Sequence, residues 1–174
     1  MTSKPLIIPV FIPQQGCPHQ CVFCNQSVIT ARGPAADGNH LPAKAEIDAV
    51  VDRYLGYRGS RDRVELAFFG GNFLGLSREA VHSLLSAVQP RADSGDIDGI
   101  RFSTRPDTVT GRTLEWLRPF RVCTVELGVQ SMDDADVSHS VALPVRPNLN
   151  FSDILPVAKQ NSRLIPFTGV DFSK

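Results

Sequence analysis

The sequence predicts an α/β protein built from about four βα units. Short runs of apolar and β-branched residues alternate with segments in which apolar residues recur at helical spacing, in the order β-α-β-α-β-α-β. Glycine, proline and polar residues separate the two kinds of segment. This alternation favours parallel strands joined by right-handed helical crossovers, with ligands bound at the carboxyl ends of the strands.

The first unit begins with Leu6–Ile12, which is apolar on both faces, as a buried parallel strand should be. Phe11 lies in this run and is expected to be a core residue. The stretch Thr30–Pro42 is rich in Gly, Pro, Ala and Asn, so it predicts an irregular connection. A helix is predicted over residues 43–57, because the apolar side chains there follow the i, i+3, i+4 spacing of one helical face.

The later units follow the same plan. Val64–Phe69 is the second predicted strand, and Ser77 is well placed to cap the helix after it. Ile100–Ser103 is the third predicted strand, and Thr110 is expected to cap the next helix. Arg121–Gly128 is the fourth predicted strand. The carboxyl ends of these strands are therefore where binding residues are sought.

Length and composition indicate one soluble domain. The chain has 174 residues and a formal net charge of zero, which offers no global electrostatic footprint for nucleic acid. The apolar run Pro5–Pro13 is too short to span a membrane and has no small-residue cleavage site after it. Three ligand-type cysteines without a disulfide framework predict a reducing compartment, with the cytoplasm as the default.

Cys17, Cys21 and Cys24 are the strongest chemical signal, because closely spaced thiolates select zinc or iron. Disulfides are disfavoured, since three cysteines cannot pair among themselves and Cys123 lies in a predicted strand. A structural zinc site normally has four ligands, and only His19, inside the loop, is available as a fourth. A cubane iron-sulfur cluster usually takes four cysteines, so three would leave one iron open.

The Cys-x-x-x-Cys-x-x-Cys loop, with Phe23 before its last cysteine, resembles that of the radical S-adenosylmethionine (radical SAM) enzymes. The resemblance implies that the three cysteines hold a 4Fe-4S cluster whose fourth iron is chelated by the amino and carboxylate groups of S-adenosylmethionine. Reductive cleavage of that cofactor gives methionine and a 5'-deoxyadenosyl radical, which abstracts hydrogen from a substrate. It also implies a partial (β/α) TIM-like barrel, with about four βα units of the usual six, and an electron donor such as ferredoxin or flavodoxin.

Further motifs resemble the branch that contains the catalytic subunit of Elongator and the oxygen-independent coproporphyrinogen oxidases. Gly70, Gly71 and Asn72 match the glycine-pair motif whose backbone contacts the amino group of S-adenosylmethionine, although relatives often have Glu or Thr in place of the asparagine. Ser103 and Gln130 match polar residues that hold the ribose and methionine part. The alternatives are a tight turn at the glycines, a strand-end cap at Ser103 and a solvated loop residue at Gln130.

The resemblance extends from about Leu6 to Ser140. We therefore expect residues 1–140 to form the N-terminal part of the radical SAM barrel, and residues 141–174 to be an atypical tail, frameshifted or poorly ordered. Pro144 and Pro147 oppose a helix in that tail. Without a further βα unit, the fourth strand is expected to be an exposed edge of the sheet.

The function expected from the resemblance is radical SAM chemistry on an unknown substrate, either an RNA or a small molecule. The Elongator-like motifs imply transfer RNA modification, but no acetyltransferase domain or basic RNA-binding arm is recognisable. Turnover is expected to be slow or undetectable if the strands that hold the adenine are missing. The alternative is a non-catalytic iron-sulfur or zinc binding module, or an inactive fragment.

Overall fold

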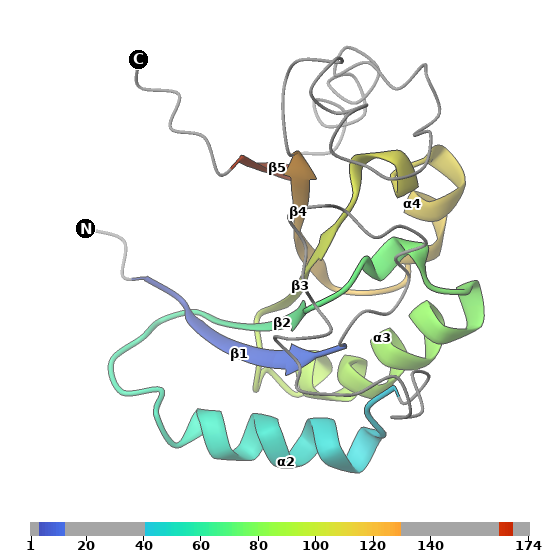
Figure 1. Cartoon of the computed structure of the whole chain (residues 1–174). Helices are drawn as coiled ribbons and strands as arrows, with labels where there is room; N and C mark the ends of the chain where they lie inside the picture. Colours follow the sequence, from blue (N-terminus) through green and yellow to red (C-terminus); the bar gives the residue numbers. More distant parts are fainter. Residues whose placement is uncertain (1–3, 13–40, 130–163, 169–174) are drawn as a thin grey trace, which may run out of the picture.

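A computed structural model describes residues 4–12, 41–129 and 164–168 of the chain (Figure 1). Ten elements follow one another in these ranges: β1 Leu6–Phe11, α2 Lys44–Leu55, β2 Val64–Phe69, η1 Phe73–Gly75, α3 Arg78–Asp93, β3 Gly99–Thr104, η2 Pro106–Thr108, α4 Gly111–Leu117, β4 Val122–Val129 and β5 Leu164–Thr168. The predicted strands and helices are all present, with ends that move by one or two residues. The 3-10 turns η1 and η2 were not predicted.

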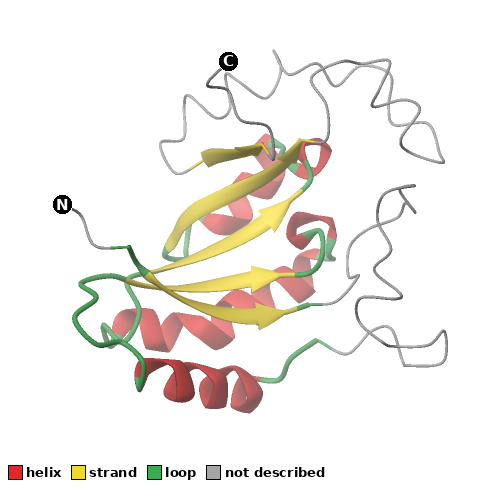
Figure 2. Cartoon of the chain, turned by 60° about the vertical axis from the view of Figure 1, so that its left-hand side comes forward, coloured by secondary structure: helices red, strands yellow, loops and turns green. Residues whose placement is uncertain are grey.

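The strands form one parallel sheet in the order β1-β2-β3-β4-β5. Figure 2 shows the strands pointing the same way, with the helices against one face of the sheet. Because sequential strands are neighbours and each βα connection crosses back on the same side, the arrangement is part of a (β/α) barrel. The predicted α/β class and the partial TIM-like barrel are therefore confirmed.

The core lies between the sheet and the helices. Alternate residues of each strand point to that side, so Ile8 and Val10 of β1 are buried there together with Ile47 and Val51 of α2. Deeper in the layer Phe73 stacks between Phe68 and Phe102, with ring centroids 5.1 and 4.3 Å apart. Burial of these apolar faces leaves the opposite face of the sheet for other chemistry.

Phe11 does not belong to this core, so that expectation was wrong. Its neighbours Val10 and Ile12 point to the helices, and Phe11 therefore points to the opposite face, where it is 64% exposed. The ring lies 6.4 Å from that of Phe69, its register partner on β2. The two aromatic side chains thus stand at the carboxyl ends of adjacent strands.

The helix caps agree with the sequence. Ser77 accepts a hydrogen bond from the Ala80 backbone N–H at 3.2 Å, and Thr110 accepts one from that of Thr113 at 3.1 Å. Each cap satisfies a donor that the first turn of a helix would otherwise leave unpaired. Helices α3 and α4 therefore begin where their capping residues were predicted.

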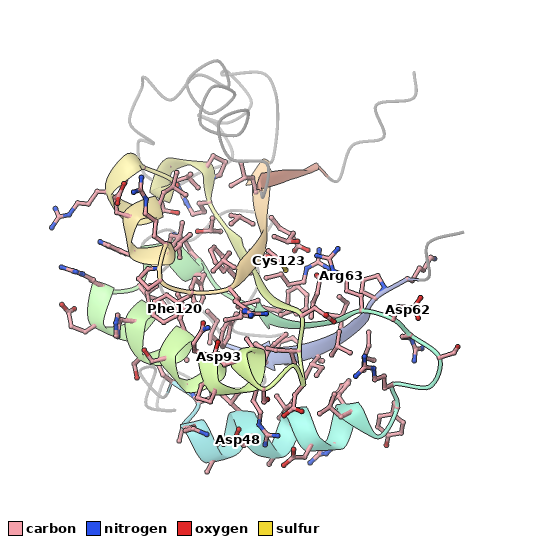
Figure 3. All side chains as sticks on the ribbon, turned by 180° about the vertical axis from the view of Figure 1, so that it is seen from behind. Asp48, Asp62, Arg63, Asp93, Phe120 and Cys123 are labelled. Atoms are coloured by element: carbon pink, nitrogen blue, oxygen red, sulfur yellow. The ribbon has the colours of Figure 1, made fainter. Side chains whose placement is uncertain are left out.

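Arg91 of α3 ties two helices and a turn together. Its guanidinium lies 2.9 Å from Asp48 and from Asp52 of α2, and 3.1 Å from Asp96 in the turn before β3. Hydrogen bonds from Lys44 and then from Arg91 lower the pKa of Asp48 below its usual range. Asp48 is labelled on α2 in Figure 3. This cluster fixes α2 against α3 at the outer surface.

The expectation that β4 forms an exposed edge was also wrong. β5, which lies within the predicted tail, pairs in parallel with β4 from Val125↔Leu164 to Val129↔Thr168. No βα unit was predicted in the tail, and this five-residue run, which contains Pro166, was not identified from the sequence. An edge strand tolerates proline, since one side of its backbone has no ladder to complete. The domain boundary at residue 140 stays a prediction.

An irregularity in β4 brings Cys123 close to β3. The register passes from Ile100↔Val122 to Arg101↔Thr124, so Cys123 has no partner of its own. Its thiol donates to the Ile100 carbonyl at 3.3 Å. A Cβ placed on Gly99 would lie 2.7 Å from Cys123 Sγ and 2.8 Å from its Cβ. Glycine at position 99 is therefore required by this close approach.

We predict that Gly99→Ala lowers the free energy of unfolding by about 1–3 kcal/mol, because the added methyl group must displace Cys123 or the backbone of β4. Urea denaturation followed by circular dichroism measures the change. Gly111→Ala is the matched control, since nothing lies within 4 Å of a Cβ there. A Gly99→Ala variant as stable as the control would contradict the described bulge.

Candidate functional site

The candidate site is the edge of the sheet formed by the carboxyl ends of the strands. Gly70 follows β2 directly, and Ser103 is the penultimate residue of β3. Cys17, Cys21 and Cys24 follow β1 in the sequence and Gln130 follows β4, but these four residues lie outside the described ranges. The structure therefore brings Ser103 to the same edge as the glycine turn, and the positions of the other predicted residues stay predictions.

The glycine turn needs its first glycine. Gly70 has φ of +89°, in the left-handed region that side chains rarely adopt. The chain there turns from β2 into η1, whose Phe73 packs in the core. This conformation accounts for Gly70 as a turn residue and also leaves its backbone open to a close-lying ligand, so both interpretations of the motif remain compatible with the geometry.

Asn72 is buried, with 2% of its surface exposed, and its side-chain oxygen accepts hydrogen bonds from the end of β3 and the turn after it. Asn72 Oδ1 accepts hydrogen bonds from Thr104 Oγ1 at 2.7 Å, from the Arg105 backbone N–H at 3.0 Å and from Thr108 Oγ1 at 3.1 Å. Thr104 Oγ1 in turn accepts from the Leu74 backbone N–H at 3.1 Å. These contacts lock the turn after β2 to the turn after β3.

Charged residues occupy the face of the sheet opposite the helices. Arg63 Nε lies 2.8 Å from Glu65 Oε1, and Arg101 Nη1 lies 3.2 Å from Glu65 Oε2. Arg101 Nη2 also donates to Glu126 Oε1 at 2.7 Å, and Ser103 Oγ donates to Glu126 Oε2 at 2.7 Å. We call these five residues the inner-face network. It runs across β2, β3 and β4 and ends at Ser103, near the candidate site.

Burial changes along the inner-face network. The Glu65 side chain is only 4% exposed, whereas that of Glu126 is 16% exposed. Among buried side-chain atoms of the described residues, Glu65 Oε2 and Arg101 Nε have no hydrogen bond, although both side chains are ion-paired. Glu65 is therefore enclosed within the network, whereas Arg63 at one end is exposed and the Glu126–Ser103 end is partly accessible.

The sequence contained a signal for this network that was missed. Glu65, Arg101 and Glu126 each stand between apolar residues within a predicted strand. A charged side chain inside a strand needs a partner of opposite sign, because burial of an unpaired charge is very costly. One arginine between two glutamates on adjacent strands satisfies that need.

Cys123 lies in β4, as predicted, and is placed beside the Arg63 end of the network (Figure 3). Burial, and secondarily the charge of Glu65, raises the pKa of the Cys123 thiol. A thiol with a raised pKa is a poor metal ligand, because metals bind the thiolate. Within the described ranges no three His, Cys, Asp or Glu side chains are grouped so that they could hold a metal ion.

The groups present at this edge fit S-adenosylmethionine by their chemistry. The glycine turn offers backbone without an obstructing side chain, and Ser103 with Glu126 offers oxygen acceptors for an ammonium or hydroxyl group. Phe11 and Phe69 provide an apolar boundary beside them.

No helix in the part of the chain that the structure describes is long and apolar enough to cross a membrane.

Comparisons with known proteins agree with this picture. The family model described as the radical SAM superfamily matches residues 11–170. An uncharacterized KamA family protein of Methanocaldococcus jannaschii is 23% identical over 125 residues, which are 69% of this chain and 19% of that protein. The structure of Methanocaldococcus infernus Elp3 with an N-terminal deletion superposes with a TM-score of 0.54 at 17% identity, over 100% of this chain and 40% of that one. The chain thus spans less than half the length of either protein.

We predict that Asn72→Ala lowers the free energy of unfolding by about 1–3 kcal/mol, because buried donors of Thr104 and Arg105 lose their acceptor. Urea denaturation measures the loss. Gln89→Ala is the control, since Gln89 Oε1 also accepts from a backbone N–H, that of Arg121 at 3.2 Å, but at an exposed position. Equal losses in the two variants would show that Asn72 does not lock the two turns.

Proposed function

The chain belongs to the radical SAM superfamily, because the family model matches residues 11–170, and from this premise we propose that it binds a 4Fe-4S cluster and S-adenosylmethionine. The observation that carries the proposal is the place of the three cysteines in the sequence, after β1. Cys17, Cys21 and Cys24 follow β1 in the sequence, and the carboxyl end of β1 lies beside those of β2 and β3. A parallel α/β sheet binds its ligands at that edge.

In this proposal the three cysteines hold the cluster and leave one iron open for the amino and carboxylate groups of S-adenosylmethionine. When bound, the cluster supplies the electron for reductive cleavage of S-adenosylmethionine to methionine and a 5'-deoxyadenosyl radical. The backbone of Gly70 and Gly71 is proposed to contact the methionine end. Ser103, with Gln130, is proposed to hold the ribose and methionine part.

Asn72 has a narrower role in this proposal than the motif alone implies. Its side-chain oxygen already accepts from Thr104, Arg105 and Thr108, so we assign its acceptor to the lock between the two turns. Contact with the cofactor at this turn then comes from the backbone. Asn72 contributes by holding the glycine turn and the end of β3 in a fixed relation.

An electron donor such as ferredoxin or flavodoxin and a reducing compartment, the cytoplasm, complete the proposal. The similarity to Elp3 supports the Elongator-like branch by fold alone, and the substrate is proposed only as an RNA or a small molecule. The second candidate function is a non-catalytic metal-binding module. It shares with the enzyme the three closely spaced cysteines and differs from it in the absence of turnover.

We predict that anaerobic reconstitution with iron and sulfide loads about four iron atoms per chain, giving an oxygen-sensitive absorption band in the blue. Replacement of Cys17, Cys21 or Cys24 by Ala abolishes the band, because each thiolate binds one iron. Cys123→Ala is the matched control and retains it, since this thiol faces the Ile100 carbonyl within the sheet. Tight binding of one zinc ion, with no iron-sulfur spectrum, would refute the cluster.

We also predict slow formation of 5'-deoxyadenosine when the reconstituted protein is reduced with dithionite in the presence of S-adenosylmethionine. The rate is low because no substrate is present to accept the radical. Chromatography quantifies the product against the Cys21→Ala variant. A cluster-loaded protein that forms no more 5'-deoxyadenosine than this variant would favour the non-catalytic module over the enzyme.

A further inference from the structure

We propose that Arg101 and Glu126 are positioning residues that fix the Ser103 hydroxyl as a hydrogen-bond acceptor toward the bound cofactor. The inference rests on the proposed function and deepens it. The sequence motif points to Ser103 and Gln130 but assigns no role to either charged residue. The inner-face network connects both of them to Ser103.

The direction of the Ser103 hydrogen bond follows from the chemistry of its partner. Ser103 Oγ lies 2.7 Å from Glu126 Oε2, and a carboxylate in a salt bridge has no hydrogen to donate. The single hydroxyl hydrogen of Ser103 is therefore directed at Glu126. Only the lone pairs of Ser103 Oγ remain for another molecule. A hydrogen bond to a charged acceptor is stronger than one between neutral groups, so the hydroxyl is held in this orientation.

Arg101 fixes the carboxylate that orients the serine. Its Nη2 donates to Glu126 Oε1 at 2.7 Å, while its Nη1 is paired with Glu65 at 3.2 Å. Nη2 of Arg101 is hydrogen-bonded to Glu126 and Nη1 is ion-paired with Glu65, so movement of the guanidinium with Glu126 is restricted. Glu126 Oε2 is thereby kept toward Ser103. The enclosed Glu65, which is also paired with Arg63, anchors the whole arrangement in the sheet.

The Ser103–Glu126 pair consequently offers only acceptors to a molecule on the inner face. The side chain of Glu126 is 16% exposed and that of Ser103 is half-buried, so both are within reach of such a molecule. S-adenosylmethionine carries two kinds of donor that suit this pair, the ribose hydroxyls and the N–H groups of its amino group. The shared requirement is a hydrogen-bond donor on the ligand, directed at β3 and β4.

Glu126→Gln tests the orientation of the Ser103 hydroxyl, because an amide can donate a hydrogen bond to Ser103 and a carboxylate cannot. Arg101 has no acceptor, so the amide oxygen of the new side chain turns to Arg101 and its NH₂ group turns to Ser103. The Ser103 hydroxyl then accepts from the amide, which occupies one of its two lone pairs and leaves its own hydrogen without the charged acceptor that held it. The hydroxyl is no longer fixed as an acceptor, so its contact with a ligand donor weakens.

The experiment is a double-mutant cycle on the anaerobically reconstituted full chain, with S-adenosylmethionine affinity measured by calorimetry. Ser103→Ala is expected to weaken binding about tenfold in the wild-type background, the cost of one hydrogen bond. In the Glu126→Gln background the same change is expected to alter affinity less than about threefold, because the Ser103 hydroxyl is no longer held in the accepting orientation. Glu115→Gln, which breaks an exposed pair with Arg118, is the control background and should preserve the tenfold cost.

Two further measurements separate the possible causes. Binding of 5'-methylthioadenosine, which keeps the ribose hydroxyls and lacks the amino group, shows from which donor Ser103 accepts. Coupling retained with this ligand assigns the ribose, and coupling lost assigns the amino group. Urea denaturation of each variant measures stability separately. If Glu126→Gln does not fold, Glu126→Asp replaces it, since the shorter side chain keeps its charge but withdraws from Ser103.

Equal costs of Ser103→Ala in the wild-type and Glu126→Gln backgrounds would overturn the inference, because a merely structural role for Glu126 leaves the two effects additive. That result, with normal binding by the wild type, would leave the proposed function intact. A wild-type protein that carries the cluster and does not bind S-adenosylmethionine would overturn the proposed function and this inference together.

Discussion

Burial of one face of a parallel sheet is the constraint on which the rest of the structure depends. Alternate side chains of β1 to β4 pack against the helices, where Ile8, Leu66 and Phe102 are fully buried. The period of two along a strand then commits every other residue to the opposite face. Because of this alternation, Phe11 is exposed, and Arg101, Ser103 and Glu126 lie together on the opposite face. The chemistry of the inner face is therefore a consequence of packing on the other side.

The inner face has its own requirement, which is charge balance. Glu65 is enclosed within the sheet, and an enclosed carboxylate is tolerated only with opposite charges and hydrogen bonds around it. Arg63 and Arg101 supply the opposite charges, and Glu126 supplies the second partner that Arg101 needs. The network therefore joins three strands by charge where their backbones are already joined by hydrogen bonds. It also transmits a fixed orientation to Ser103 at the open end.

Local signals in the sequence were sufficient for strands β1 to β4, for helices α2 to α4 and for the caps of α3 and α4. The strand patterns, the helical spacing after Lys44 and the capping roles of Ser77 and Thr110 depend only on neighbouring residues, and all were predicted correctly. The two expectations that were wrong depended on contacts with residues distant in the sequence. The exposure of Phe11 follows from which face meets the helices, and the pairing of β5 with β4 joins segments more than thirty residues apart. The metal-binding role of the cysteines stays a prediction that the described residues do not address.

Asn72 shows how a departure from a family pattern is accommodated by its surroundings. A carboxylate at this position would bring a second negative charge to the end of β2, whereas the amide of Asn72 is neutral and can be buried. Its oxygen accepts from Thr104, Arg105 and Thr108, so its acceptor serves a structural contact. A negative charge on the inner face is carried by Glu126 on β4, two strands away. Since adjacent strands lie about 4.8 Å apart, that charge is displaced by roughly 10 Å from the glycine turn. A cofactor bound here would therefore meet backbone at β2 and oriented oxygen acceptors at β3 and β4.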